Sequence, residues 1–478
     1  MEEKNSLRYG DLELWVRIPR PPRMNDNSEG ERVSSENLAM REPRHVGRDY
    51  QPGHARQKRL TGWKLIASVS ALVVTSLVIS VGTVVGWALF NLTSSLQTVA
   101  LPGHEQPALA GIGEWDGGFN VLVVGSDTRV GQGEQFGVTD SELNDVNLLV
   151  HVSENHDHAT VISFPRDTLI DIPACEQDDG SMSTPRSMTP LNNTWSIGGL
   201  PCVAKTLEEL TGLEIGYAGV MTFTGVAQLS TAVGGVDVCI TEPIFDPWSG
   251  LDLPEAGWNT VEGGQALAFL RTRKGVGDGS DLARISSQQV YMSALVRKLQ
   301  ADGVLNDITR LYSIAQVAAQ TMVLSSSLGS LDVMVSMARA LRTIPDENIV
   351  FVQFPVLDAP EGYSGKVVPD WNLAEALLQK VRNDEPYVLG DNSIGRGSRE
   401  APADEQTTEA DTPADTPAEQ TTTDAASAET GGSDSSPSDT ATDTPADQPV
   451  TEDPAPEPEV IEGLVGQTAS DVTCAVAN

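Results

Sequence analysis

The sequence predicts an α/β domain, with helices layered on a β-sheet, over about residues 115–390. Two patterns along this span lead to the prediction. Short β-branched runs bounded by turn residues recur, as is typical of buried strands. Between them lie longer stretches whose apolar residues follow helical spacing. Because the two kinds of segment alternate, we expect a sheet covered by helices, although the pattern does not give the strand order.

The runs with strand character are short and rich in Val, Ile and Leu, and turn residues flank them. In chain order they are NVLVVG (120–125), NLLVHV (147–152), ATVISF (159–164), VDVCI (236–240) and IVFVQFPV (349–356). Pro201 occupies a first-turn position of one helical stretch, and Ser280 is suited to cap another that starts near Asp281. The predicted helices are PCVAKTLEELTG (201–212), TGVAQLSTAVGG (224–235), GQALAFLRTR (264–273), DLARISSQQVYMSALVRKLQ (281–300) and DWNLAEALLQKVRN (370–383).

An uncharged apolar segment of about 26 residues, 65–90, precedes the domain and is long enough to span a bilayer as a helix. Arg56, Lys58, Arg59 and Lys64 lie before it, and no Lys or Arg follows until Arg129. The positive-inside rule then places the N-terminus in the cytoplasm and the domain outside, in a single-pass protein of the cell membrane. A cleaved signal peptide fits less well because about 60 residues precede the apolar run.

Polar segments lie at both ends of the chain. Residues 1–62 have few aliphatic side chains and are expected to be a disordered cytoplasmic segment. Residues 397–460 are dominated by Thr, Ala, Asp, Pro, Glu and Ser, so we expect a disordered linker. Residues 461–478 regain apolar side chains and contain Cys474, which suggests that this segment docks back onto the domain.

All four cysteines follow the apolar segment, so on this topology disulfides are permitted. Cys175 and Cys202 flank a loop rich in Ser, Pro and Met, and we expect them to pair, which leaves Cys239 for Cys474. Four cysteines allow three pairings, and the sequence does not choose among them. No spacing resembles a zinc site.

The formal net charge is −36, and about 19 acidic residues with no Lys or Arg lie from Glu400 onward. The chain lacks a basic face for phosphate backbones, so nucleic acid is not an expected partner. Only six histidines are present, which weakens any Ser-His or His-metal mechanism. His156 and His158 in ENHDH are more typical of a polar hairpin turn than of a metal cluster.

The stretch LRTRKGVGDGSDLARISSQQ (270–289) gathers basic residues in this acidic chain. They are Arg271, Arg273, Lys274 and Arg284. Asp281, Arg284 and Gln288 have the spacing i, i+3, i+7 and share one helix face, which we expect at the edge of the core. Ordinary surface arginines are one interpretation, and an anion site is the other, because the guanidinium fork suits phosphate oxygens.

Further charged residues lie at the ends of predicted strands. Asp127 and Arg129 follow the first run, Asp145 precedes the second, and Arg166 follows the third. In open α/β sheets the ligand crevice lies outside strand ends, so the side chains of Asp127 and Arg166, which both follow strands, are expected to converge there. Carboxylates bind Mg²⁺, and arginines together with the ion neutralise phosphate oxygens, so we hypothesise Mg²⁺-assisted phosphoryl transfer.

These motifs, in order and spacing, resemble the LytR-CpsA-Psr family over about residues 115–300. The matching segments are VLVVGSDTR, NDVNLLVHV, SFPRDTLIDIP, LNNTWSIGGLPC, TLEELTG, LSTAVGGVDVCI and ALAFLRTRKGVGDGSDLARISSQQ. The resemblance implies an α-β-α layered domain with a central mixed sheet. It also implies a phosphotransferase that moves a glycopolymer from a polyprenyl-pyrophosphate carrier in the cytoplasmic membrane onto peptidoglycan, at the C6 hydroxyl of N-acetylmuramic acid. The lipid chain would lie in an apolar tunnel, with its pyrophosphate at the mouth beside Mg²⁺.

The resemblance assigns a role to each matching residue. Asp127 and Asp145 match the metal-binding carboxylates, and Asp145 is expected to be catalytic as well. Arg166 matches the arginine of the Pro-Arg-Asp motif, and Arg271 and Arg273 match the paired arginines. Arg284 and Gln288 match the helix Arg and Gln. The arginines are expected to act in catalysis and, with Gln288 and Arg129, to bind pyrophosphate.

Two positions depart from the family pattern. Leu143 and Ser287 stand where the family often has arginine, and Arg129 or Lys274 would have to compensate. These departures keep open a non-catalytic regulator or scaffold that binds polyprenyl phosphate. A pyrophosphatase of the lipid carrier also stays open, because water and a sugar hydroxyl are chemically similar acceptors. The sequence does not identify the polymer.

Overall fold

The computed structural model describes residues 62–95, 97–104, 115–126, 143–177, 179–402 and 458–478. Asp127, Arg129, nearly all of the expected N-terminal segment and most of the acidic linker lie outside these residues. The chain divides into two units, Met1–Ser76 and Leu77–Asn478. Helix α1 is Gly62–Ser95. By combined length and hydropathy, none of the helices in the described ranges qualifies to cross a membrane.

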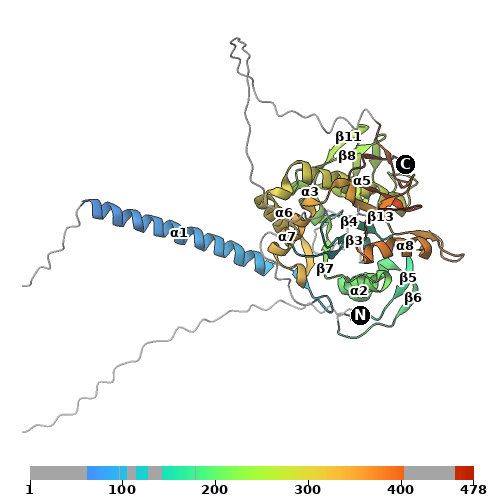
Figure 1. Ribbon diagram of the computed structural model, residues 1–478, viewed down its shortest axis with the longest axis horizontal. Coiled ribbons are helices and arrows are strands. Elements are labelled where there is room, and N and C mark those ends of the chain that lie inside the picture. The colour runs from blue at the N-terminus through green and yellow to red at the C-terminus, as the bar shows by residue number, and fades with distance from the viewer. Residues whose placement is uncertain (1–61, 96, 105–114, 127–142, 178, 403–457) are drawn as a thin grey trace, which may run out of the picture. The chain divides into compact units, whose positions relative to one another are not determined.

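The centre of the second unit is an eight-stranded mixed sheet (Figure 1). Its spatial order is β1 (Gln97–Val99), β12 (Met322–Ser325), β7 (Tyr217–Met221), β2 (Phe119–Ser126), β3 (Asn144–Val152), β4 (Ala159–Ser163), β13 (Ile349–Gln353) and β19 (Val465–Thr468). The β2–β7 and β4–β13 pairs are parallel, whereas β3 is antiparallel to both of its neighbours. The expected α/β class with a central mixed sheet is confirmed.

The predicted strand 236–240 lies in a different sheet from the other predicted strands. This second sheet has the order β11 (Gly257–Val261), β8 (Val236–Ile240), β20 (Thr473–Ala475) and β17 (Ser398–Glu400). Val236, Val238 and Ile240 pack in a separate core with residues of α4 and α5. Alternation along the strand gives burial but not the sheet to which a strand belongs, so the sequence did not reveal this second core.

The remaining strands form two-stranded pairs. They are β5 (Leu169–Ile172) with β6 (Arg186–Pro190), β9 (Ile244–Asp246) with β10 (Leu251–Leu253), β14 (Val356–Asp358) with β15 (Val367–Pro369), and β16 (Tyr387–Leu389) with β18 (Glu459–Ile461). The predicted run 349–356 is divided, because β13 ends at Gln353 and Val356 begins β14. Pro355 lies between the two, and it has no N–H to continue the ladder.

The helices are α2 (Thr194–Thr211), α3 (Phe223–Ala232), α4 (Gly264–Arg271), α5 (Asp281–Ala301), α6 (Ile308–Thr321), α7 (Leu331–Ala340) and α8 (Trp371–Arg382). Short 3-10 turns are Leu191–Asn193, Val304–Asn306, Ser326–Leu328, Leu341–Thr343 and Asp346–Asn348. The five predicted helices are all present. Non-helical backbone at Gly198 and Gly199 divides α2, so Pro201 lies in the first turn of its second part, as expected. Helices α6 and α7 were not predicted.

Helices cover both faces of the central sheet. Leu122 and Val124 of β2 point to the face where α2 and α8 pack. Val121 and the neighbouring Val150 of β3 point to the opposite face, toward α5 and α7. Successive residues of a strand alternate between faces, so β2 and β3 contribute to both cores. The second face also carries the cavity described below.

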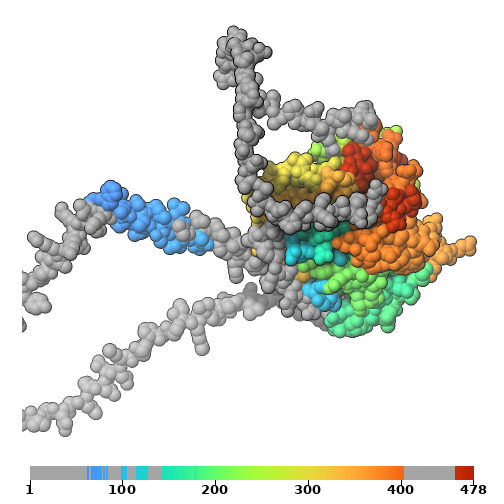
Figure 2. Space-filling view, viewed as in Figure 1, coloured from blue at the N-terminus to red at the C-terminus, as the bar shows by residue number. Residues whose placement is uncertain are grey.

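The C-terminal segment packs into the domain through backbone pairing at several places. Strand β19 extends the central sheet at β13, β18 pairs with β16, and β20 pairs with β8 and β17. In Figure 2 the red residues of this segment lie against the orange part of the chain that contains α8 and β16. Residues separated by the acidic linker therefore share three sheets: the central sheet, the second sheet and the β16–β18 pair.

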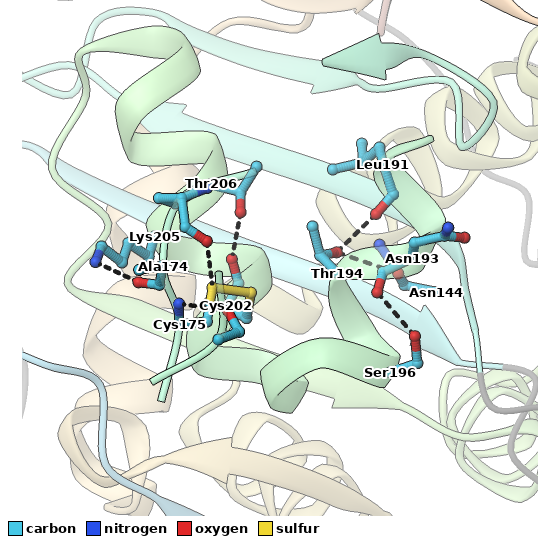
Figure 3. The surroundings of a disulfide bond; sticks show 12 residues. Asn144, Ala174, Cys175, Leu191, Asn193, Thr194, Ser196, Cys202, Lys205 and Thr206 are labelled. Carbon is cyan, nitrogen blue, oxygen red and sulfur yellow. Dashed lines mark hydrogen bonds between the residues drawn. A yellow bond between two sulfur atoms is a disulfide. The ribbon is translucent and has the colours of Figure 1, made fainter. Parts of the chain in front are cut away.

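The structure contains two disulfides, Cys175–Cys202 and Cys239–Cys474. The first ties the segment after β5 to α2, beside the hydrogen bond that Lys205 Nζ donates to the Ala174 carbonyl at 2.8 Å (Figure 3). The second joins directly paired positions of the neighbouring strands β8 and β20. It therefore holds the C-terminal segment against the second sheet.

Candidate functional site

The loop between α4 and α5 positions the first arginines of the site. Helix α4 ends at Arg271, and the fully buried Thr272 donates from Oγ1 to Asp246 Oδ2 at 2.7 Å. Gly277 has a φ of 51°, and a Cβ there would lie 2.8 Å from the Arg396 carbonyl oxygen. Only glycine suits this backbone and this close approach. The turn thereby aims Arg273 at the start of α5.

Helix α5 brings the second part of the site. Ser280 caps it, with Oγ accepting from the Ala283 N–H at 3.2 Å, as the sequence predicted. Arg284 is 4% exposed and Gln288 is 7% exposed, so both are buried, whereas we expected them at the core edge. They can be buried because each donates to a backbone carbonyl: Arg284 to Asp145 at 2.7 Å and Gln288 to Leu270 at 2.7 Å.

Asp281 is the anion that several arginines share. Its Oδ1 lies 2.8 Å from Arg284 Nη2, 3.2 Å from Arg273 Nη2 and 3.7 Å from Arg166 Nε. Its side chain is 12% exposed, so these interactions take place largely out of water. The sequence placed Asp281 on the same helix face as Arg284 but gave it no role. The i, i+3 spacing of the two residues was the signal.

Asp145 and Arg166 meet where β3 begins and β4 has ended. Arg166 Nη1 donates to Asp145 Oδ1. The neighbouring Asn144 is fully buried, and its Nδ2 donates to Asn147 Oδ1 at 2.6 Å. Its Oδ1 accepts from Thr194 Oγ1 at 3.4 Å, an interaction drawn in Figure 3. These bonds fix the start of β3 and, with it, the position of Asp145.

Asp167 and Lys366 form a pair beside Arg166 that the sequence did not indicate. Lys366 Nζ lies 2.5 Å from Asp167 Oδ1, and Asp167 Oδ2 lies 3.7 Å from Arg166 Nε. Lys366 comes from the segment just before β15, far along the chain from the Pro-Arg-Asp motif. No local pattern marks such a partner.

Arg271 and Lys274 have different surroundings. The Arg271 guanidinium lies over the Phe223 ring, 4.2 Å from its centroid, and Arg271 lines the cavity with the other arginines. Lys274 Nζ instead lies 5.8 Å from the ring centroid of Trp248, which is 80% exposed. Lys274 is not among the residues that line the cavity, so the structure does not place it where it could replace the family arginines missing at Leu143 and Ser287.

The cluster carries excess positive charge. In the described ranges, four guanidiniums face two carboxylates, with Asp167 matched by Lys366: Arg166, Arg271, Arg273 and Arg284 against Asp145 and Asp281. Burial lowers the pKa of Arg166, but the charge and hydrogen bond of Asp145, helped by Asp281 and Asp167, raise it overall. The pKa of Arg273 is lowered, first by burial and then by Arg284. Both arginines stay charged.

Several polar atoms of the cluster also lack well-formed hydrogen bonds. Within the described part of the chain these are the Nε atoms of Arg166 and Arg284 and both carboxylate oxygens of Asp281. Buried polar atoms are usually satisfied, so unsatisfied ones in a functional cluster point to a missing partner. An anion with several oxygens would supply acceptors to the arginines.

The cluster lies at one end of an apolar cavity of about 670 Å³. Strands β2 and β3 form one wall, and residues of α3, α4, α5, α6 and α7 form the others. Apolar lining residues include Val123, Leu148, Val150, Val226, Leu267, Met292, Leu295, Leu299, Leu311 and Ile314. Charged lining residues are Asp145, Arg166, Arg271, Arg273 and Arg284. The cavity thus suits a molecule with an anionic head and an apolar chain.

The structure brings together all of the predicted site residues that it describes. Asp145, Arg166, Arg271, Arg273, Arg284 and Gln288 all line this cavity. Ser287, at one departure from the family pattern, is fully buried and donates from Oγ to the Arg284 carbonyl at 2.9 Å. Asp127 and Arg129 lie outside the described residues.

Fold and site define an α/β protein with a cationic cluster at one end of an apolar cavity. The chain belongs to the LytR_cpsA_psr family, whose model matches residues 93–383. The resemblance seen in the sequence is therefore confirmed.

The curated relatives agree with this membership. The chain is 27% identical to cell wall biosynthesis protein LcpA of Corynebacterium glutamicum over 320 residues, 60% of each chain. It is 30% identical to the probable cell wall biosynthesis protein LcpB of that organism, over 55% of this chain and 61% of the relative. It is 28% identical to the polyisoprenyl-teichoic acid–peptidoglycan teichoic acid transferase TagT of Bacillus subtilis, over 57% of this chain and 80% of the relative. The match thus spans about three-fifths of the two Corynebacterium proteins.

Among solved structures, TagT bound to LI-WTA matches with a TM-score of 0.44 and 22% identity. The match covers 60% of this chain and 98% of that one.

Proposed function

We propose that this chain is a transferase that moves a glycopolymer from a polyprenyl-pyrophosphate carrier onto peptidoglycan. The observation that carries the proposal is the buried arginine cluster at one end of the apolar cavity. Pyrophosphate supplies the negative charge and the acceptor oxygens that the cluster lacks, and a polyprenyl chain suits the apolar walls. Family membership and the transferase names of relatives such as TagT support the same reaction class.

Arginines do most of the work in the proposed mechanism. Arg166, Arg273 and Arg284 bind the pyrophosphate oxygens and neutralise charge that develops in the in-line transition state. The acceptor hydroxyl oxygen of peptidoglycan attacks the phosphorus that bears the glycan. The bond from that phosphorus to the bridging oxygen breaks, and polyprenyl phosphate leaves with the electron pair. The hydroxyl proton passes to a carboxylate, for which Asp145 and Asp127 are the candidates.

The donor set around the cluster fits Mg²⁺, which prefers carboxylate oxygens and substrate phosphates. Asp145 lines the cavity, and the two carboxylate oxygens of Asp281 lack well-formed hydrogen bonds among the described residues. We propose that Asp145 and Asp127 hold the ion, which when bound neutralises charge on the pyrophosphate. Arg166 orients Asp145 by donating to its Oδ1.

We also propose that the protein is anchored in the cell membrane by residues 65–90, with the domain outside. The support is the sequence and not the helices of the structure: the segment is uncharged and apolar, and Lys and Arg residues precede it. A lipid-linked donor lies in the same membrane, so an anchor keeps the cavity close to its substrate. The disulfides fit an oxidising compartment.

The test is a turnover assay on the full chain in detergent, with a polyprenyl-pyrophosphate glycan and uncrosslinked peptidoglycan. Polyprenyl phosphate should be released only when glycan becomes attached to peptidoglycan, and Mg²⁺ should be required. Arg166→Ala should abolish transfer, whereas the control Arg186→Ala, at an exposed arginine of β6, should not.

Other outcomes would reject the transferase. Release without attachment would mean a pyrophosphatase. Tight lipid binding without turnover would mean a regulator or scaffold, and the departures at Leu143 and Ser287 would then gain meaning.

A further inference from the structure

Two buried histidines and an aspartate meet at the far end of β3 from the arginine cluster. His151 lies near the end of β3, His158 lies just before β4, and Asp384 follows α8. Both histidines are buried, at 8% and 7% exposure. Asp145 and His151 are six residue steps apart along β3, or about 20 Å along an extended strand. This group is therefore separate from the phosphate site.

The Nδ1 atom of each imidazole faces an oxygen. His151 Nδ1 lies 2.8 Å from Asn120 Oδ1, and the Asn120 amide is oriented because its Nδ2 donates to the Glu214 carbonyl at 2.8 Å. His158 Nδ1 lies 2.7 Å from Asp157 Oδ1. An oxygen at Nδ1 keeps a proton there and leaves the Nε2 lone pair for another partner. Metal-binding histidines are typically held in this way by carboxylate or amide oxygens.

Asp384 completes the group, and the conformation of its own backbone and a hydrogen bond from the Glu154 N–H hold its carboxylate in place. Its φ is 57°, in the left-handed region, and its Oδ2 accepts from the Glu154 N–H at 2.8 Å. Its Oδ1 lies 3.0 Å from His151 Nε2. A ligand atom from each of the two histidines and Asp384 can be chosen so that all three lie within 4.8 Å of one another.

We propose that His151, His158 and Asp384 form a binding site for a divalent transition-metal ion of the Zn²⁺ class. Two imidazoles and one carboxylate are a ligand set that suits Zn²⁺, whereas Mg²⁺ prefers oxygen ligands. Ligand atoms about 2.0–2.2 Å from a tetrahedral ion are roughly 3.4 Å apart. The 3.0 Å between His151 Nε2 and Asp384 Oδ1 would widen slightly to admit an ion, and any separation near the 4.8 Å limit would shorten. The Asp384 side chain is 30% exposed, which leaves a route for the ion and room for a fourth ligand.

The bound ion would fasten distant parts of the domain together. His151 and His158 flank the β3–β4 hairpin, and Asp384 belongs to the turn that leads from α8 toward β16. We therefore expect a structural role, with stability rather than transfer chemistry depending on the ion. The proposal is independent of the transferase assignment, because no residue of the arginine cluster takes part.

The histidine that the sequence singled out beside His158 supplies the control. His156 lies in the hairpin turn with a φ of 55°, and its Nε2 lies 3.0 Å from the Gly117 carbonyl oxygen. His156→Asn removes an imidazole two residues from His158 and keeps a residue type that tolerates this backbone. Asp384→Asn likewise tolerates its left-handed backbone and removes only the charge.

The experiment is titration of the chelator-treated full chain with Zn²⁺, followed by calorimetry and by thermal unfolding, in excess Mg²⁺ to occupy oxygen-rich sites. Co²⁺ absorption in the visible range reports nitrogen-containing tetrahedral coordination. We expect one Zn²⁺ per chain, a higher Tm, and binding weakened at least tenfold by His158→Gln and by Asp384→Asn but not by His156→Asn. Asp157→Asn, which leaves all three ligands in place, should weaken binding about 10-fold.

Three results would overturn the site. The first is a Tm that does not rise with Zn²⁺. The second is an affinity for Zn²⁺ that is the same in the ligand variants and the wild type. The third is a Co²⁺ spectrum typical of octahedral coordination by oxygen. If His158→Gln fails to fold, Asp384→Asn and Asp157→Asn decide the question, because neither alters an imidazole.

Discussion

Replacing Asp281 with Asn removes the carboxylate that three arginines share, at almost constant side-chain volume. The nearest guanidinium, that of Arg284, lies 2.8 Å away and is 5% exposed, whereas Arg273 and Arg166 are 29% and 20% exposed. Breaking a buried ion pair by removing one partner costs about 3–5 kcal/mol. Because solvent screens two of the three arginines, we expect a loss near the lower limit, about 3 kcal/mol. For a domain of this size the Tm should fall by about 6 °C.

The assay is thermal unfolding of the full chain with and without inorganic pyrophosphate. Pyrophosphate should raise the Tm of Asp281→Asn more than that of the wild type, because the variant leaves one more positive charge to neutralise. The matched control is Asp278→Asn, three residues away. Asp278 is 46% exposed and its carboxylate lies 3.4 Å from Arg396 Nη1, so its loss should cost below about 1 kcal/mol.

Two results would refute this reasoning. If Asp281→Asn lowers stability no more than Asp278→Asn, the shared carboxylate does not hold the arginines together. If pyrophosphate raises the Tm of the variant and of the wild type equally, or raises the Tm of neither protein, the cluster is not the anion site.

Further substitutions test other parts of the structure. Arg166→Lys keeps the charge but loses the planar guanidinium fork, so the transfer rate should fall about 100-fold. Asp145→Ala should abolish transfer. Near-normal turnover of either variant would remove that residue from the mechanism. Val150→Phe narrows the cavity, so KM should rise more for long polyprenyl donors than for short ones, and an equal rise for both would place the chain elsewhere. Replacing Cys239 and Cys474 with serine opens a link across 235 residues and should cost up to about 5 kcal/mol in unfolding measurements. The other disulfide spans 27 residues, and its removal should cost less, about 3.5 kcal/mol; the reverse order would contradict the loop-entropy argument.

Loss of the Cys239–Cys474 disulfide should also affect activity. The residues after Cys474 hold the loop that carries Arg273: the Gly277 N–H donates to the Val476 carbonyl at 2.8 Å, and Asn478 Nδ2 donates to the Lys274 carbonyl at 3.1 Å. A C-terminal segment that comes loose would therefore release this loop. We expect a lower transfer rate in the oxidised full chain carrying the two serines, and unchanged turnover would show that the loop keeps its position without the disulfide.

Much of the candidate site was predictable because its signals are local. Ser280 as a helix cap, and Asp281 with Arg284 on one helix face, follow from spacing alone. Arg166 follows a predicted strand, where α/β sheets bind ligands, and it does reach a site carboxylate, that of Asp145 at the start of β3. Helix α6 shows that local signals can also be overlooked: Asp307 caps it, and its buried residues Leu311, Ala315 and Ala319 recur every four positions.

The sequence by itself determined the family, the α/β class and the residue types of the arginine cluster, because caps, periodicity and motif spacing act within a few residues of chain. Only the tertiary structure decided that residues 236–240 join a second sheet, that β19 extends the central one, and that Lys366 pairs with Asp167. It also brought Asp384 to His151 across 233 residues of sequence. Such contacts depend on how whole faces of sheets and helices bury their apolar surface together, which no local pattern records.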